Sequence, residues 1–151
     1  MLHVYKTYYP DTVGGVEAVI EQICAASQPF GIQSQVLTLS QDAHLIKHNA
    51  IAVHRAHLDF EFASTGFSWQ FIFMLKKLAK NVDVIHYHFP WPFMDMAHFL
   101  ARVRKPTILT YHSDIVKQKN LLKLYRPLMG QFLKSVDCIV ATSPNYLATT
   151  E

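Results

Sequence analysis

The sequence predicts an α/β fold of the Rossmann-like type, in which a doubly wound, mostly parallel sheet carries helices on both faces. Three observations lead to this prediction. Short apolar segments of strand type alternate along the chain with segments of helical apolar spacing, as in parallel crossover units. A glycine pair, Gly14-Gly15, stands between the first segment of each type. The 151 residues are 50% hydrophobic, which suits one domain with a sizeable core.

The expected elements follow one another in regular alternation. Segments rich in apolar and β-branched residues predict six strands, over 2–6, 32–39, 49–58, 82–89, 106–112 and 136–142. Apolar residues at helical spacing predict a helix from Val16 to a stop at Gly31, and helices over 67–80, 93–103 and 120–134. Pro127 is expected to begin a new helix or to kink the last one, and Ser143-Pro144 to begin a further helix.

Charge is distributed unevenly along the chain, although its formal net value is only +3. Residues 96–136 contain eight Lys and Arg side chains and a single acidic one, Asp114. Such a segment is typical of a surface that meets a phosphate-bearing substrate or an anionic membrane, and a solvated basic face is the alternative. Nucleic acid is disfavoured as a partner, because no nucleic-acid-binding motif accompanies the basic residues.

The apolar runs of the chain are short. The longest, from Phe71 to Leu75, is far below the roughly 18 or more residues of a membrane-spanning helix. Residues 1–20 lack the basic start and apolar core of a secretory signal. We therefore expect a cytoplasmic location.

Three polar clusters follow predicted strands at the point where each strand ends. They are Gly14-Gly15-Val16-Glu17 after the first strand, His86-Tyr87-His88 at the end of the fourth, and His112-Ser113-Asp114 after the fifth. In an open parallel sheet, ligands bind at the carboxyl ends of the strands, near the point where the strand order reverses. The usual strand order makes the first and fourth strands neighbours there. The three clusters are therefore expected to line one crevice.

The glycine pair opens the first predicted helix. Backbone N–H groups at a helix N-terminus face outward and favour anions, so this turn can hold a phosphate or a developing negative charge. A plain tight turn is the alternative interpretation, because glycine is common in turns. A G-x-G-x-x-G pattern is missing, which argues against the dinucleotide site of dehydrogenases.

Two histidines of the fourth strand, His86 and His88, lie two residues apart and so project from the same face. Three roles stay open for them and His112: structural hydrogen bonding, hydrogen bonding to a substrate, or coordination of zinc by all three imidazoles. A Ser-His-Asp nucleophile is disfavoured, because adjacent residues leaving a strand do not point at one another. The other histidines are expected at the surface or at sheet edges: His3, His44, His48, His54, His57 and His98.

Four motifs together resemble a known enzyme family. They are Tyr8-Tyr9-Pro10 with Gly14-Gly15-Val16-Glu17, Asp83-Val-Ile-His-Tyr-His88 followed by Phe89-Pro-Trp-Pro, Pro106 through Thr110-Tyr-His-Ser-Asp114, and Asp137-Cys-Ile-Val-Ala-Thr-Ser143. Their order and their places at strand ends resemble the amino-terminal half of the retaining glycosyltransferases of the glycogen-synthase-like, group 1 type. The likeness extends in particular to bacterial mannosyltransferases of O-antigen and exopolysaccharide synthesis, and it covers essentially the whole chain.

This resemblance implies a GT-B enzyme, in which two Rossmann-like domains face each other across a cleft and no metal is required. It implies that the amino-terminal domain chiefly holds the acceptor and that the other domain holds the sugar nucleotide, a GDP- or UDP-sugar. By this likeness, Gly14-Gly15 contacts the donor diphosphate and the transferred sugar. His112 is the implied catalytic residue, which hydrogen-bonds that sugar near the reacting centre. The other substrate-binding residues that the motifs imply are Val16, Glu17, His88, Ser113, Asp114, Lys117 and Lys119, the last three on the acceptor side.

Residues 1–151 are accordingly expected to form one acceptor-side domain, truncated and without the carboxyl-terminal, donor-binding domain that would be its partner. The expected activity of the parent enzyme is retaining transfer of a mannose-type sugar from a sugar nucleotide to a lipid-linked or polysaccharide acceptor, with a peripheral contact to an anionic membrane. The chain alone is expected to be inactive. Two alternatives stay open: a non-catalytic binding module or inactive remnant, and a zinc hydrolase built on His86, His88 and His112.

Overall fold

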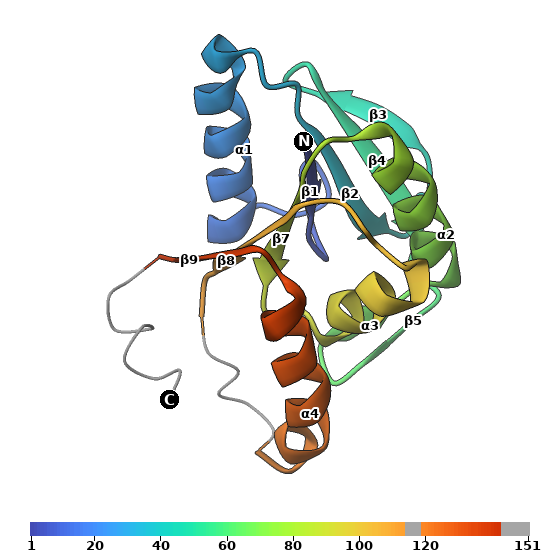
Figure 1. Cartoon of the computed structure of the whole chain (residues 1–151). Coiled ribbons are helices and arrows are strands. Elements are labelled where there is room, and N and C mark those ends of the chain that lie inside the picture. Colours follow the sequence, from blue (N-terminus) through green and yellow to red (C-terminus); the bar gives the residue numbers. More distant parts are fainter. Residues whose placement is uncertain (114–118, 143–151) are drawn as a thin grey trace.

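At the centre of the fold lies a seven-stranded sheet in the order β3-β4-β2-β1-β7-β8-β9 (Figure 1). The computed structural model describes residues 1–113 and 119–142, without the side chains of residues 119–124. The strands are β1 (Leu2–Val4), β2 (Gln35–Ser40), β3 (Leu45–His48), β4 (Ile51–His57), β7 (Ile85–Phe89), β8 (Thr107–Tyr111) and β9 (Cys138–Ala141). Neighbouring strands run parallel except β3 and β4. The predicted α/β class and mostly parallel sheet are confirmed.

The strand order reverses beside β1, which lies between β2 and β7. Leu2 pairs with Gln35 on one side and with Ile85 on the other, so β1 is hydrogen-bonded along both edges. The next pairing, β7 with β8, sets His88 opposite Thr110. The first and fourth predicted strands are thus neighbours, as expected, and the carboxyl ends of β1, β7 and β8 adjoin.

Helices cover both faces of the sheet, as predicted. Helix α1 lies on one face, and α2, α3 and α4 lie on the other (Figure 1). The helices are α1 (Gly15–Ser27), α2 (Trp69–Leu78), α3 (Pro92–Ala101) and α4 (Lys119–Ser135), and two 3-10 turns, η1 (Gln28–Phe30) and η2 (Ala79–Asn81), follow α1 and α2. Helix α4 runs through Pro127. The helix expected from Ser143 lies outside the described residues.

The larger of two apolar clusters fills the space between the sheet and α2, α3 and α4. Its largest fully buried side chains include Trp91, Tyr87 and Phe71, and the Trp91 indole N–H donates to the carbonyl of Gly66 at 3.2 Å. Burial of one such side chain stabilises a fold by about 1.5–3 kcal/mol. This cluster holds the sheet against the three helices and so keeps the carboxyl ends of the strands in place.

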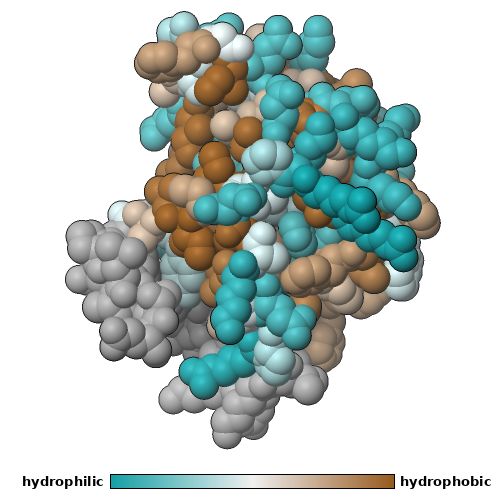
Figure 2. All heavy atoms as spheres, in the orientation of Figure 1, coloured by the Kyte–Doolittle hydropathy of each residue, from teal (hydrophilic) through white to brown (hydrophobic). Residues whose placement is uncertain are grey.

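The face that carries α1 has a hydrophobic core of its own. Its apolar cluster is smaller and joins Ile20 and Cys24 of α1 to Val36 and Val53 of the sheet. Figure 2 shows apolar side chains gathered over α1 and the neighbouring sheet. Within residues 1–113 and 119–142, no helix is both long and apolar enough to span a membrane.

Two antiparallel hairpins were not expected from the sequence. The first joins β3 to β4, and the second forms a separate two-stranded sheet. The strands of this second hairpin are β5 (Phe60–Phe62) and β6 (Thr65–Phe67). Both turns use two non-glycine residues with positive φ, Asn49 and Ala50 in one and Ala63 and Ser64 in the other. Because such turns usually contain glycine, Ala63-Ser64 carries no turn signal and Asn49 carries only a weak one.

Candidate functional site

Three predicted polar clusters meet at one edge of the sheet, where β1, β7 and β8 end. Gly14 and Gly15 stand where α1 begins, after the loop that follows β1. His88 is the penultimate residue of β7, and His112 follows β8 directly. The backbone N–H of His112 donates to the carbonyl of Phe89 at 3.1 Å, which extends the pairing of β7 and β8 past their ends.

Tyr5, which follows β1 directly, packs against the histidines. The centroid of its ring lies 6.4 Å from that of His88, in an edge-to-face arrangement. Burial, and secondly the charge of Glu17, raise the pKa of the Tyr5 hydroxyl to about 12. Tyr5 therefore packs beside His88 and remains protonated at neutral pH.

Four imidazoles form what we call the histidine cluster: His3, His86, His88 and His112. Nε2 of His112 lies 3.0 Å from Nδ1 of His88, and Nε2 of His88 lies 3.1 Å from Nδ1 of His3. His86 instead pairs its Nε2 with the hydroxyl of Thr110 at 2.7 Å. The His86 ring stacks on the His88 ring, with centroids 4.5 Å apart and planes 24° apart. The cluster thus contains a hydrogen-bonded chain of three rings, with a fourth ring packed against it.

The cluster is electrically neutral at physiological pH. Burial, and secondly the neighbouring His86, lower the pKa of His3 to about 3. Burial, and secondly His112, lower that of His86 to about 4. Burial also holds the pKa of His88 well below its ordinary value and lowers that of His112. Each ring therefore offers one N–H and one lone pair.

Two histidines were placed wrongly by the sequence analysis. His3 is buried inside the cluster, because β1 is a central strand with neighbours on both sides. His98 is buried between α3 and the sheet, where its Nδ1 lies 2.9 Å from the Tyr87 hydroxyl. A signal for His3 was available, since the predicted neighbours β1 and β7 pair His3 with His86.

The glycine turn has two residues in different surroundings. Gly14 is the N-cap of α1 and provides no side-chain cap. Glu17 in the first turn is buried, accepts a hydrogen bond from the Thr12 hydroxyl at 2.7 Å, and lies against Gly14. Gly15 is exposed, and a Cβ added there would meet no atom within 4 Å. The open space at the start of α1 is therefore in front of Gly15, while Val16 packs on the apolar cluster under α1.

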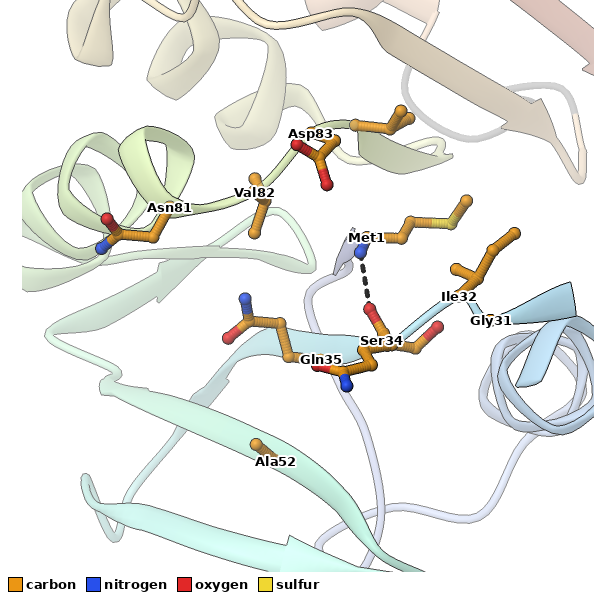
Figure 3. A pocket seen from close by; sticks show the side chains of 11 residues that line it. Met1, Gly31, Ile32, Ser34, Gln35, Ala52, Asn81, Val82 and Asp83 are labelled. Atoms are coloured by element: carbon orange, nitrogen blue, oxygen red, sulfur yellow. Dashed lines mark hydrogen bonds between the residues drawn. The ribbon is translucent and has the colours of Figure 1, made fainter. Parts of the chain in front are cut away.

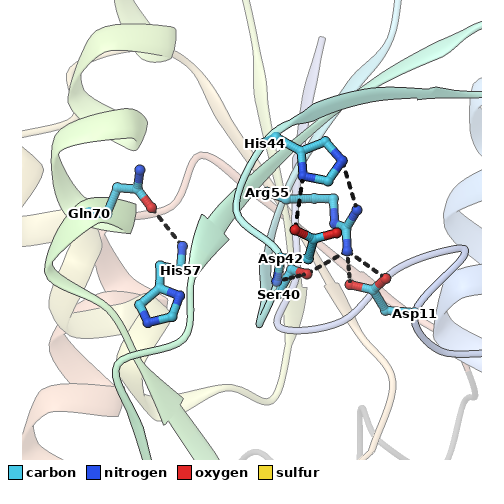
Figure 4. Close-up of polar contacts among 7 residues, drawn as sticks. All are labelled: Asp11, Ser40, Asp42, His44, Arg55, His57 and Gln70. Carbon is cyan, nitrogen blue, oxygen red and sulfur yellow. Dashed lines mark hydrogen bonds and ion pairs between the residues drawn. The ribbon is translucent and has the colours of Figure 1, made fainter.

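A pocket of about 580 Å³ opens beside the glycine turn, at the carboxyl ends of β1, β2 and β4. Arg55 of β4 is buried in its wall and donates to both carboxylate oxygens of Asp11, at 2.8 and 2.9 Å, and to the Ser40 hydroxyl at 2.6 Å (Figure 4). Asp42 and Glu61 line the pocket and are exposed. The volume suits a small ligand, and the lining offers the charged and hydroxyl groups that hydrogen-bond sugar hydroxyls.

The remaining predicted site residues follow β8. Ser113 is exposed directly after His112. Asp114 and Lys117 lie outside the described residues, and so does the side chain of Lys119, the first residue of α4. Their expected acceptor-side roles stay predictions.

Four basic residues of segment 96–136 lie at the edge of the sheet opposite the histidine cluster. Arg102, Arg104 and Lys105 lie between α3 and β8, and Lys134 lies at the end of α4 shortly before β9. These connections reach the amino-terminal ends of β8 and β9. In the part of the chain that the structure describes, these four basic residues therefore do not line the edge that holds the histidine cluster.

A second pocket, of about 620 Å³, lies at that opposite edge (Figure 3). The amino group of Met1 donates to the carbonyl of Gln33 at 2.6 Å in its wall, and Asp83 and Gln35 line it. This pocket is separated from the histidine cluster by the length of the strands, so it does not belong to the same site.

A zinc site on the cluster is not favoured by the positions of its nitrogens. His3, His86 and His88 each offer one nitrogen within 4.8 Å of the others. Zinc ligands point at a common centre about 2.0–2.1 Å from each nitrogen. Both nitrogens of His88 instead face a nitrogen of a neighbouring ring at hydrogen-bond distance. Of the predicted set, His88 and His112 are hydrogen-bonded to each other, and His86 bonds to Thr110 instead.

Comparison with known protein families shows the family to which this chain belongs. The profile of Glycosyltransferase Family 4 matches residues 13–149. The chain belongs to this glycosyltransferase family. The matched region contains the glycine turn and His86, His88 and His112, and the resemblance to group 1 glycosyltransferases is confirmed.

Two curated bacterial proteins are similar to this Family 4 chain over its full length. The D-rhamnosyltransferase WbpZ of Pseudomonas aeruginosa is 55% identical over 153 residues, and the O-antigen chain mannosyltransferase C of Escherichia coli is 50% identical over 154 residues. The chain spans 40% and 41% of the length of these relatives.

Proposed function

We propose that this chain forms the acceptor-side part of a retaining glycosyltransferase that uses a sugar nucleotide. The observation that carries the proposal is the shared edge, where the glycine turn, the histidine cluster and the pocket beside Arg55 adjoin in a Family 4 chain. Ligands of parallel α/β sheets bind at this edge. The proposal treats the pocket as the acceptor site and the glycine turn as the donor end.

Each group has a chemical task that suits its surroundings. The uncapped first turn of α1 presents N–H groups beside Gly15, where a diphosphate can approach without meeting a side chain. His112 hydrogen-bonds the transferred sugar. In the transfer, the bond from the anomeric carbon to the diphosphate oxygen breaks, and the acceptor oxygen bonds to the same face of that carbon. The acceptor proton leaves with the diphosphate, whose developing charge the N–H groups stabilise.

The names of the two relatives support a mannose-type sugar as the group that is transferred. Their names refer to D-rhamnose and to mannose in an O-antigen chain. We therefore propose transfer of a mannose-type sugar from a GDP- or UDP-sugar to a lipid-linked or polysaccharide acceptor. No metal is assigned a role in this transfer.

We further propose that two domains of the enzyme bind the acceptor and the sugar nucleotide separately. The chain corresponds to about two fifths of each relative. We assign residues 1–151 to an acceptor-side domain and the grip on the nucleotide to a second domain of the same enzyme, across a cleft. Alone, the chain should bind sugar nucleotides weakly and transfer nothing.

Location at the inner face of the cytoplasmic membrane completes the proposal. Exposed Arg102, Arg104 and Lys134 can attract anionic lipids, an attraction that weakens as salt rises. Sedimentation with liposomes tests this contact. Binding to anionic vesicles that exceeds binding to neutral ones, and that declines with salt, supports it; equal binding to both counts against it.

A donor-consumption assay on the full-length enzyme tests the proposed activity. The protein is incubated with single sugar nucleotides and a lipid-linked glycan acceptor, and release of nucleoside diphosphate is measured. Release with one GDP- or UDP-sugar that depends on the acceptor supports the proposal. Binding of sugar nucleotides without any turnover would favour the non-catalytic module instead.

A further inference from the structure

We propose that His3 and His88 fix the tautomer of His112, so that Nδ1 of His112 carries the proton and is a hydrogen-bond donor. His3 and His88 are then positioning residues, which act through His112. Nε2 of His112 is engaged with His88, so Nδ1 is the ring nitrogen left for a ligand. That this ligand is the transferred sugar rests on the proposed function; the tautomer itself does not.

The hydrogen bonds that join the three neutral rings can run in only two directions, which we call the first and the second order. A neutral imidazole has one N–H and one lone pair, so the direction of one hydrogen bond sets the direction of the next. In the first order, Nδ1–H of His3 donates to His88, Nδ1–H of His88 donates to Nε2 of His112, and the proton of His112 lies on Nδ1. In the second order every bond is reversed, and Nδ1 of His112 is a bare acceptor.

His3, at the buried end of the three hydrogen-bonded rings, decides between the two orders. Nε2 of His3 is buried and has no hydrogen-bond partner among the described residues. In the first order this atom is a lone pair, whereas in the second it is an N–H group without an acceptor. Buried donors without partners are rarer in proteins than under-satisfied acceptors. The first order is therefore the favoured one.

Protonation does not open a third order at neutral pH. An imidazolium would donate from both nitrogens and break the alternation, but burial places the pKa of His3 at about 3 and holds that of His88 well below its ordinary value. The backbone adds a second constraint, since the His112 N–H is bonded to Phe89 and the ring follows a paired strand. His112 thus has a fixed position as well as a fixed proton.

A fixed donor has a defined use in transfer. The N–H on Nδ1 of His112 can donate to a hydroxyl oxygen of the transferred sugar and hold that sugar in place while the bond to the diphosphate breaks. Donors that are already oriented need no rearrangement at that moment. The other tautomer would present a lone pair, which can accept a hydrogen bond from the hydroxyl but cannot donate one to it.

The chain also contains a matched control. His86 is buried on the same sheet face and packs on the rings of His3 and His88, but its Nε2 bonds to Thr110 and not to the chain of three rings. Replacing His86 removes as much buried ring as replacing His88 and leaves the hydrogen-bonded chain intact.

Long-range ¹H–¹⁵N correlation spectra of the ¹⁵N-labelled chain at pH 7 test the proposal. The His112 signals are identified by their loss in His112→Ala. We expect Nδ1 of His112 at the shift of a protonated nitrogen and Nε2 at that of an unprotonated one. A proton on Nε2 in the unmodified protein overturns the proposal without any variant.

Variants test the origin of the tautomer. In His88→Ala both His112 nitrogens should move toward the averaged shifts of a free imidazole, and in His86→Ala they should stay in place. If His88→Ala does not fold, His3→Leu takes its place. It should shift both His112 nitrogens toward the averaged values in the same way. An unchanged His112 pattern in a folded His88→Ala or His3→Leu protein overturns the assignment. Failure of sugar transfer in the full-length enzyme would contradict the proposed function and leave these spectra unaffected.

Discussion

The neighbouring glycines of the turn should respond to alanine in opposite directions. A Cβ at Gly14 would lie 2.5 Å from Oε2 of Glu17, whose buried carboxylate accepts from Thr12. Gly14 has an extended backbone with φ of −152°, so the conflict is one of space and not of strain. Displacing Glu17 weakens its hydrogen bond, and alanine is also a poorer N-cap than glycine. Together these effects should lower the free energy of unfolding by about 1–3 kcal/mol.

Gly15→Ala is the matched substitution one residue later. Its Cβ meets no atom within 4 Å, and alanine restricts the unfolded chain more than glycine does. Since Gly15 is the first residue of α1, the free energy of unfolding should increase by about 0.5–1 kcal/mol. The two variants should therefore differ by roughly 1.5–4 kcal/mol, the sum of the two effects above.

Urea unfolding followed by circular dichroism at pH 7 measures both changes. A double-mutant cycle with Thr12→Val tests the cause, because Gly14→Ala should cost less when the hydroxyl that holds Glu17 is already gone, with a coupling of about 0.5–1 kcal/mol. The reasoning is refuted if Gly14→Ala leaves the stability within about 0.5 kcal/mol of the unmodified protein, the usual error of such comparisons. It is equally refuted if Gly15→Ala destabilises as much as Gly14→Ala does.

Three further substitutions and measurements follow from buried polar groups. Burial raises the pKa of Asp95 from 3.8 to about 8, so the folded protein keeps a proton that the unfolded chain releases, and stability should fall as pH rises from about 4 to 8. Asp95→Asn should flatten this dependence in thermal melts and stabilise the protein by about 1–3 kcal/mol at pH 7, and an unchanged pH profile would contradict the assignment. Arg55→Met should lower the free energy of urea unfolding by about 2 kcal/mol, because Asp11 loses its buried partner. Adding Asp11→Asn should restore part of this loss. If the losses of the two single variants simply add in the double variant, the two side chains do not act as a pair. Metal analysis of protein purified without a His tag should find less than one zinc per chain, because both nitrogens of His88 are hydrogen-bonded; stoichiometric zinc that disappears in His88→Ala would revive the metal alternative.

The sheet order could be predicted from the sequence because it depends on local signals and on the rule for parallel crossovers. Strand-type and helical segments alternate, and a doubly wound sheet then places the first and fourth strands side by side. The two hairpins could not be predicted in this way. Their turns place Asn49-Ala50 and Ala63-Ser64 at positive φ without the glycine that usually marks such turns, so only the tertiary structure reveals them.

The candidate site was predicted in part. Polar residues at strand ends identify an edge, which is how His88 and His112 were selected. The pairing of Arg55 with Asp11 was not foreseen, because it depends on how the loop after β1 returns over β4, and no local pattern records that path. His3 was missed for a related reason, since a lone histidine in a three-residue strand gains meaning only from the register with β7.

Initial rates of acceptor glycosylation by the full-length enzyme, compared among four variants, test the central claim most directly. Gly15→Trp fills the open space at the start of α1, and His112→Ala removes the proposed donor to the sugar. Gly130→Trp, at another helical glycine with open space around it, and His57→Ala, at an exposed histidine, are the matched controls. We predict a loss of about 100-fold or more in the first two variants and near-normal rates in the controls. Equal rates in all four variants would contradict the assignment of this edge to glycosyl transfer.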